Sequence, residues 1–265
     1  MTDKPKKYKL EPEPGGEFPD INSLFNETLA EFQDNMNVYV LAGVGQLIVI
    51  MPVVLIGVFA LYAGMAVGMG GVMFLGVAVG GLLMEYVSEG LGVVVMMLTQ
   101  FLAILVPIAV LLLFVQGIAA IIAPFNASLI RAVARHQRGE KELDLAGVFS
   151  SIGQDVPKVI AIGMMLSSMS MMGLCMCYLP ALAVPVVFGF ATSLVAIHRM
   201  SAFQGVKTAW SHFMAHLPWH ATFGAIYVGL SMVAAYVPVL GPAFLLALHT
   251  RAYRKVFGDG ETAVL

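Results

Sequence analysis

The sequence predicts an all-α fold, a polytopic transmembrane helical bundle of about six spans in which interfacial amphipathic helices precede pairs of spans. Hydrophobic residues make up 59% of the 265 residues, whereas charged residues make up only 11%. Residues 35–84 and 90–130 contain no Asp, Glu, Lys or Arg. Because an uncharged apolar run of ~18 residues already indicates a membrane span, two runs of this length are not the core of a soluble domain.

The number of spans follows from where the basic residues lie. Lysines and arginines occur in the N-terminal tail and at 131–158, 199–207 and 251–255. The segments that alternate with these clusters have none, namely 85–90, 178–181 and 236–242. The positive-inside rule then places both termini in the cytoplasm and requires an even number of spans between successive clusters. Two spans each in 38–130, 158–199 and 219–250 make six.

Parity also permits eight spans. Residues 63–84 are then a span of their own, and 91–130 contains an additional break. We favour six spans because 91–130 has no polar turn at which the chain reverses direction. In that interpretation residues 63–90 are a glycine-rich apolar insertion in the outer leaflet.

Amphipathic segments precede the pairs of spans, at 20–36, 143–156 and 201–217. In the first, apolar residues recur at helical spacing, and Glu27, Glu31 and Asp34 occupy the opposite face. Such a helix is typical of the membrane interface. Its acidic face disfavours attraction to anionic lipid, so we expect it to dock onto the protein's own loops.

These segments define one transmembrane domain, residues 20–258, between a disordered cytoplasmic tail and a short cytoplasmic C-terminal tail. The domain consists of three helical blocks, each with an amphipathic segment, two spans and a basic end. The tails are 1–19 and 259–265, and the blocks are 20–141 (with the glycine-rich insertion 63–90), 142–200 and 201–258.

Small residues recur every four positions within the first block. On a helix they form one slowly drifting stripe along which another backbone can approach closely. The stripe predicts helix packing, either within one subunit or between subunits of a homo-oligomer. Its members are Ala60, Gly64, Gly68, Gly76 and Gly80, with Val72 at the remaining position.

Two acidic residues stand apart from the cytoplasmic segments. Glu85 and Glu89 are four residues apart and share a helical face. A solvated outer turn is the interpretation we favour, and an ion or proton path is the alternative because ionisable groups near a bilayer often mark one.

Two further clusters contain residue types that bind metals. His212, His216 and His220 have the spacing of ligands on one helical face, but Pro218 interrupts them. Soft sulfur ligands suited to Cu(I) recur near residue 170, although methionine is more often flexible apolar filler and the two cysteines are expected to be buried thiols. This candidate soft-metal set is Met165, Met169, Met172, Met176, Cys175 and Cys177.

No catalytic constellation, nucleotide-binding loop or dinucleotide fingerprint occurs in the sequence. We therefore expect no enzymatic activity and no cofactor, and the few scattered basic residues exclude a nucleic-acid partner. The predicted function is that of a structural or assembly component that binds membrane lipids and protein partners. A transporter or channel for small solutes or ions is the alternative; it requires a polar, water-accessible cavity in mid-membrane.

Motifs in the second half of the chain resemble a known superfamily. They are Cys-Tyr-Leu-Pro-Ala-Leu at 177–182 leading to His198-Arg199, the segment 201–211, and Pro-Val-Leu-Gly-Pro at 238–242 leading to Gly258; residues 124–139 followed by 145–149 also fit. Together they resemble the YciC-like bacterial inner-membrane proteins with six helices, which are related to the membrane domain fused to some glycerophosphodiester phosphodiesterases. The resemblance covers about two-thirds of the chain and departs most at 63–90. It implies the fold, the topology and the bacterial inner membrane, and no catalytic residues.

Overall fold

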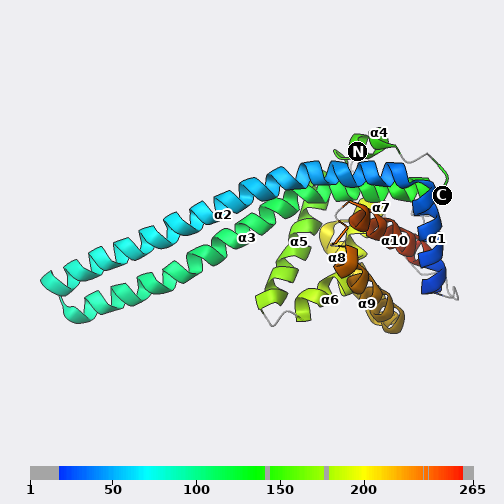
Figure 1. The fold of residues 1–265 in the computed structure, drawn as a ribbon. Coiled ribbons are helices and arrows are strands. Elements are labelled where there is room, and N and C mark those ends of the chain that lie inside the picture. The colour runs from blue at the N-terminus through cyan, green and yellow to red at the C-terminus, as the bar shows by residue number, and fades with distance from the viewer. Residues whose placement is uncertain (1–17, 141–143, 176–178, 235, 238, 259–265) are drawn as a thin grey trace, which may run out of the picture. The chain divides into compact units, whose positions relative to one another are not determined.

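The computed structural model describes residues 18–140, 144–175, 179–234, 236–237 and 239–258. These residues form helices and connecting turns with no strand, which confirms the all-α class (Figure 1). Residues 1–17 and 259–265 of the predicted tails lie outside the described residues. The helices are α1 (Ile21–Asp34), α2 (Met36–Tyr86), α3 (Glu89–Gln137), α4 (Leu145–Ser150), α5 (Val156–Cys175), α6 (Leu179–Phe188), α7 (Ala191–His198), α8 (Ala202–Ala215), α9 (Leu217–Ala234) and α10 (Leu240–Phe257).

The chain divides into two compact units. Unit 1 comprises residues 1–48 and 120–265, and unit 2 comprises residues 49–119. Helices α2 and α3 contribute residues to both units. Each unit is described separately below.

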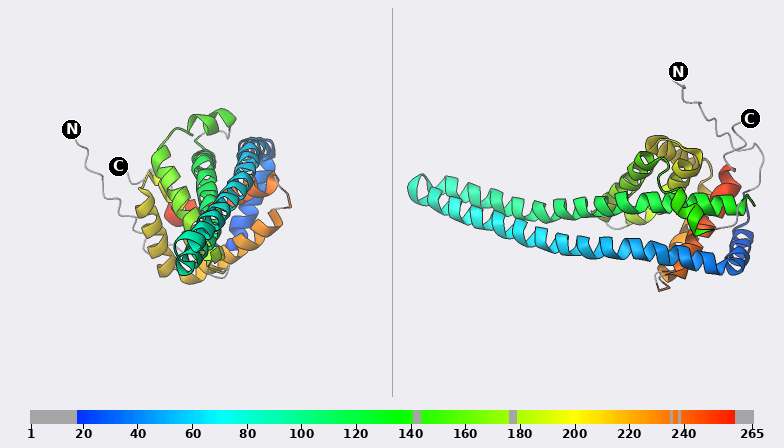
Figure 2. Two further views of the ribbon diagram at one scale, coloured as in Figure 1. Left: turned by 90° about the vertical axis from the view of Figure 1, so that its left-hand side faces the viewer. Right: turned by 90° about the horizontal axis from the view of Figure 1, so that it is seen from above.

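Unit 2 is a hairpin of two antiparallel helical arms, which run side by side in Figure 1 and in the right-hand view of Figure 2. The arms are residues 49–86 of α2 and 89–119 of α3. Residues 61–63, where the sequence suggested a boundary between a span and an insertion, lie inside one uninterrupted helix. No proline occurs between Pro52 and the end of α2, so nothing removes a backbone hydrogen bond there.

Unit 1 is built around α7 and α10. The larger of its two core clusters includes Leu194 and Val195 of α7 and Tyr253 of α10, all completely buried. The smaller cluster joins Phe32 and Tyr39 to Phe125 of α3. Around them, α5 contacts α6, α7 and α8, and α6 contacts α9.

The N-terminal amphipathic helix packs against the last helix of the chain. Asp20 is the N-cap of α1 and accepts a hydrogen bond from the backbone N–H of Ser23 (2.9 Å). Leu24 and Phe32 are buried, and Phe32 meets Phe244 of α10 edge to face with 5.5 Å between the ring centroids. The amphipathic helix predicted at 20–36 is therefore present as Ile21–Asp34, but it packs on helix α10 and not on loops as expected.

By length and composition, three helices could cross a membrane. They are α2, α3 and residues Val156–Gly173 of α5. Residues Ala183–His198 are a shorter apolar segment. The predicted membrane character of the chain is thus confirmed at this coarse level.

Candidate functional site

The most prominent surface of the molecule is the outer face of unit 2. Among the described residues of this hairpin, Ala103 is the one hydrophobic side chain that is buried. More than half of the exposed large hydrophobic side chains in the described structure belong to it, including Phe59, Val67 and Phe74, each about three-quarters exposed. Monomeric soluble proteins rarely expose contiguous apolar patches of this extent, and a larger patch indicates a membrane or protein contact.

The glycine stripe lies on the inner face of the same hairpin. A Cβ atom added to Gly64 would lie 3.2 Å from Val110, and one added to Gly80 would lie 2.7 Å from Met96. The two intermediate glycines are packed more closely still: Gly68 faces Val106, and Gly76 faces Thr99. A Cβ atom added to either glycine would overlap the facing α3 side chain more severely.

The first residue of the predicted stripe is not on this contact face. Ala60 is exposed, and Gly57, one turn earlier in the chain, faces Phe114 instead. Residues spaced exactly four apart drift slowly around a helix. A contact face that stays against one partner helix therefore needs an occasional spacing of three residues. Val72 is half-buried. Four of the glycines and α3 thus pack within one subunit, which was one of the two alternatives from the sequence.

The two acidic residues lie at the turn of the hairpin. Glu85 is in the last turn of α2, and Glu89 begins α3. Both are exposed. Between them, the hydroxyl of Ser88 accepts a hydrogen bond from the backbone N–H of Leu91 (3.2 Å), as an N-cap does. The arrangement is that of a polar turn, and an acidic N-terminus also suits the α3 dipole.

The candidate soft-metal residues fall only partly within the described structure. Met165, Met169 and Met172 lie on α5, where Met165 packs against the core of unit 1 and Met172 is 64% exposed. Cys175 ends the helix, whereas Met176 and Cys177 lie outside the described residues. Within the part of the chain that the structure describes, no three His, Cys, Asp or Glu side chains are arranged to hold a metal ion.

The three histidines do come together, at the corner between α8 and α9. Nδ1 of His212 and Nε2 of His220 are 2.8 Å apart, and the His216 ring is 4.8 Å from that of His212. Burial, followed by the charges of His220 and His216, lowers the pKa of His212 to about 4. His212 is therefore neutral at physiological pH, and its hydrogen bond with His220 fixes the corner.

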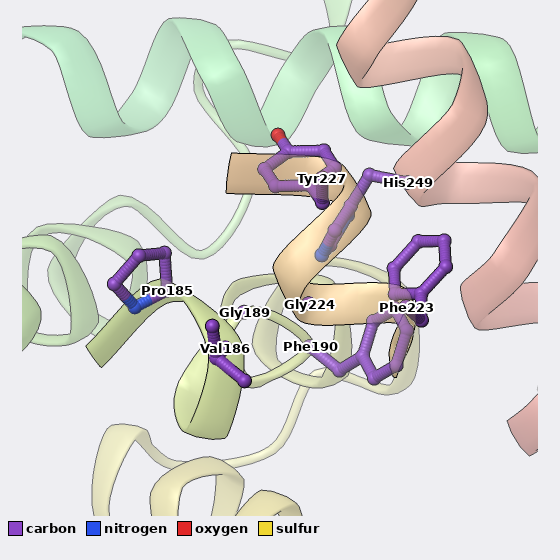
Figure 3. Close-up of a pocket in the computed structure, with 8 residues that line it drawn as sticks. All are labelled: Pro185, Val186, Gly189, Phe190, Phe223, Gly224, Tyr227 and His249. Atoms are coloured by element: carbon purple, nitrogen blue, oxygen red, sulfur yellow. The ribbon is translucent and has the colours of Figure 1, made fainter. Parts of the chain in front are cut away.

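A small pocket of unit 1 lies at the contact of α6, α9 and α10 (Figure 3). His249 and Tyr227 supply its polar groups, and Phe190, Phe223 and Val186 are among its apolar walls. Its free volume of about 10 Å³ is that of a single water molecule. It is too small to bind an organic solute.

Two polar networks in unit 1 were not expected from the sequence. Arg131 of α3 is 9% exposed and donates to three backbone carbonyls, those of Ala196 (2.8 Å), Ser151 (3.0 Å) and Gln154 (3.1 Å). It therefore joins α3, the turn after α4 and the end of α7. In the sequence it was only one member of a cytoplasmic basic cluster.

The second network joins α1 to α10. Glu27 pairs with Arg251 (2.8 Å) and Lys255 (2.7 Å), and Glu31 pairs with Arg251 and accepts a hydrogen bond from Tyr39 (2.7 Å). The hydrogen bond and charge of Lys255, together with Arg251, lower the pKa of Glu27 despite its partial burial. Glu27 and Glu31 of α1 are thus paired within the protein itself.

Comparison of the chain with protein-family models, with curated proteins and with solved structures gives no match.

Proposed function

We propose that this chain is a multi-pass protein of the bacterial inner membrane, without enzymatic activity, that serves as a structural or assembly component and binds lipids and protein partners within the bilayer. The observation that carries the proposal is the apolar outer face of unit 2. Val67, Phe74 and Leu113 are each about three-quarters exposed there, along two arms without a charge except at the turn. Only an apolar surrounding removes such a surface from water.

The proposed topology has six spans with both termini in the cytoplasm. Its spans correspond to α2, α3, α5, the broken pair α6 and α7, α9, and α10. The helices α1, α4 and α8 take the interfacial positions. Three of the spans meet the length and composition expected of a membrane helix, and the distribution of basic residues supports the remainder. The YciC-like resemblance of the sequence agrees with this arrangement.

The length of the hairpin adds a constraint. At about 1.5 Å per residue, residues 49–86 extend for about 57 Å, whereas the hydrocarbon core is about 30 Å thick. The arms therefore exceed one perpendicular crossing. In the proposed arrangement the hairpin crosses the bilayer as one tilted rod, because α2 is uninterrupted at residues 61–63, and the turn at Glu85 and Glu89 lies at or beyond the outer surface. Contacts between the α2 glycines and α3 side chains hold the two arms together.

The proposal is tested with spin labels on single cysteines, introduced after replacement of Cys175 and Cys177. A label at Val67 in liposomes should collide readily with oxygen, which concentrates in lipid, and rarely with a water-soluble nickel chelate. A label at Ala103, which is buried in the same hairpin, should collide rarely with both. Frequent collision of the Val67 label with the nickel chelate would show that the outer face is in water, and the proposal would fail.

The topology has its own test. Single cysteines at Arg138 and Lys207 should be protected from an impermeant thiol reagent in whole cells, and one at Ser88 should react. Reproducible labelling of the Arg138 position from outside would overturn the six-span arrangement.

A further inference from the structure

Helix α8 presents three large apolar side chains to the outside of unit 1. Phe203 is 70% exposed, Met214 is 55% exposed and Trp210 is 47% exposed. Their spacing of seven and four residues places them in one stripe along the helix. We call these three residues the α8 stripe.

The orientation of this stripe is determined by the opposite face of α8. Ala202, Gly205 and Ala209 are buried there, so the helix approaches α7 closely. A Cβ added to Gly205 would lie 2.9 Å from Val195 and 3.2 Å from the carbonyl oxygen of Ala191. Turning the stripe inward would bring Phe203 and Trp210 into a contact that has room only for small residues.

The start of α8 is equally well defined. Ser201 and Gln204 form a capping box, in which each side chain bonds the other residue's backbone N–H at 3.3 Å. The exposed stripe is therefore a feature of an anchored helix. Trp210 also stacks on Phe188 of α6, with 6.0 Å between the rings, which continues the apolar surface onto a proposed span.

The stretch of sequence that contains the stripe has charges of one sign. Residues 156–258 contain no Asp or Glu, and their basic residues are Lys158, Arg199, Lys207, Arg251, Arg254 and Lys255. Helix α1 supplies Glu27 and Glu31 to Arg251 and Lys255. At the other end of this region, Arg199 is 69% exposed and pairs with Asp155, which also pairs with Lys158. Lys207 is exposed and forms no ion pair with any described residue.

Lys207 lies beside the stripe, four residues after Phe203 and three before Trp210. A helix with an apolar face and a lysine at its edge has the pattern of an interfacial helix that binds anionic lipid. The contrast with α1 is informative, because α1 carries acidic residues on its polar face and uses them within the protein. By contrast, α8 and the residues from 156 to 258 around it in the sequence contain no acidic side chain.

We infer that α8 is a docking surface for anionic phospholipid, with the α8 stripe immersed among the upper acyl chains and Lys207 against the headgroup phosphates. This inference rests on the proposed membrane function and adds to it a lipid class and a binding helix. The expected selectivity is about fivefold for anionic over zwitterionic lipid, the contribution of one lysine near a charged membrane surface.

The test uses the fluorescence of Trp210 in the full-length chain carrying Trp219→Phe, since these are its two tryptophans. The protein is placed in vesicles of phosphatidylcholine or of an equal mixture with phosphatidylglycerol. Lipids brominated near the carboxyl end of the acyl chain should quench Trp210 more than lipids brominated near the methyl end. Brominated phosphatidylglycerol should quench it about fivefold more effectively, at equal concentration, than brominated phosphatidylcholine.

Two variants provide the matched comparison. Lys207→Gln should bring the selectivity ratio close to one. Ala215→Glu makes the same change in net charge on the same helix but about a quarter-turn from the stripe, and it should leave most of the selectivity. Phe203→Trp combined with Trp210→Phe moves the tryptophan to another position of the stripe. This variant provides a second reporter if one of the others does not fold.

The inference is overturned if Trp210 is quenched by aqueous iodide, or if bromolipids at neither depth quench it because protein covers the stripe. It is also overturned if the two headgroups quench equally in the parent protein. These results are distinguishable from failure of the proposed function, because the Val67 label reports independently whether the hairpin lies in lipid.

Discussion

The two units of this protein place their large apolar side chains in opposite environments. In unit 1, Leu194, Val195 and Tyr253 are completely buried, and charged side chains connect helices distant in the sequence. In unit 2, the α2 glycines lie on the inside against α3 side chains such as Val106 and Phe114, and many other large side chains are exposed. The first unit contains its own apolar core, whereas the second needs an apolar surrounding.

The magnitudes show why this difference matters. Removing one large apolar side chain from water contributes about 1.5–3 kcal/mol. Summed over the exposed side chains of unit 2, this greatly exceeds the free energy of unfolding of an ordinary domain, about 5–15 kcal/mol. The surrounding medium therefore determines where unit 2 is stable, and the close packing of its glycines determines how its two arms pair.

The largest expected effect is in unit 2, from Gly68→Leu combined with Gly76→Leu. Both glycines face α3 side chains, and overpacking of such a contact costs about 1–3 kcal/mol at each position. The melting temperature in detergent should fall markedly. Val67→Leu with Val77→Leu is the matched control, because these side chains are 75% and 62% exposed and should tolerate the change. Equal stability of the two double variants would contradict the packing of the stripe on α3.

In unit 1, Arg131→Met should have the next largest effect. It removes the donor to the carbonyls of Ala196, Ser151 and Gln154, and each such hydrogen bond contributes about 1 kcal/mol net. Arg135→Met, one turn further along α3, removes a single long bond to Gly147 (3.4 Å) and should cost less than about 1 kcal/mol. Denaturant unfolding in detergent compares them. If Arg135→Met is as destabilising as Arg131→Met, the buried network is not what matters.

A smaller effect is expected for the ion pairs between α1 and α10. The folded-state pKa of Glu27 lies below its ordinary value of 4.5 because Lys255 and Arg251 favour the carboxylate. The resulting stability is present above pH 4.5 and is lost as the pH falls through the folded-state pKa. Because Glu27 is 42% exposed, solvent screening limits the contribution to less than about 1 kcal/mol.

Glu27→Gln should therefore lower the melting temperature slightly at neutral pH and have no further effect in acid below the folded-state pKa. Asp34→Asn, which alters an exposed carboxylate on the same helix, is the control and should change neither value. A Glu27→Gln effect that persists undiminished in acid would assign the loss to something other than the ion pairs.

The smallest effect is expected at the turn of unit 2. Glu85→Gln with Glu89→Gln changes two exposed side chains and should alter stability by less than about 0.5 kcal/mol. Thermal unfolding checks this result. A pH-dependent ion flux in liposomes that is present in the parent protein and abolished in a correctly inserted double variant would instead establish an ion path.

Periodicity along the sequence determined the helical class and the amphipathic nature of 20–36 and 201–217, and the long uncharged apolar runs determined the membrane character of 35–130. These properties are local, since the residues along one helix are sufficient to predict them. The distribution of charge also limited the number of spans that the sequence allows. None of these properties requires knowledge of which helix lies beside which.

Only the tertiary structure decided which helix faces meet. The sequence placed Ala60 in the glycine stripe, but Gly57 takes that position because the contact face must follow α3. Both Phe203 and Phe213 belong to the amphipathic segment 201–217, and the small residues facing α7 leave Phe203 exposed and Phe213 buried. The sequence assigned Arg251 to a basic cluster, and the fold pairs it with Glu31, 220 positions away. Such contacts depend on packing between helices, which the spacing of residues within one helix does not encode.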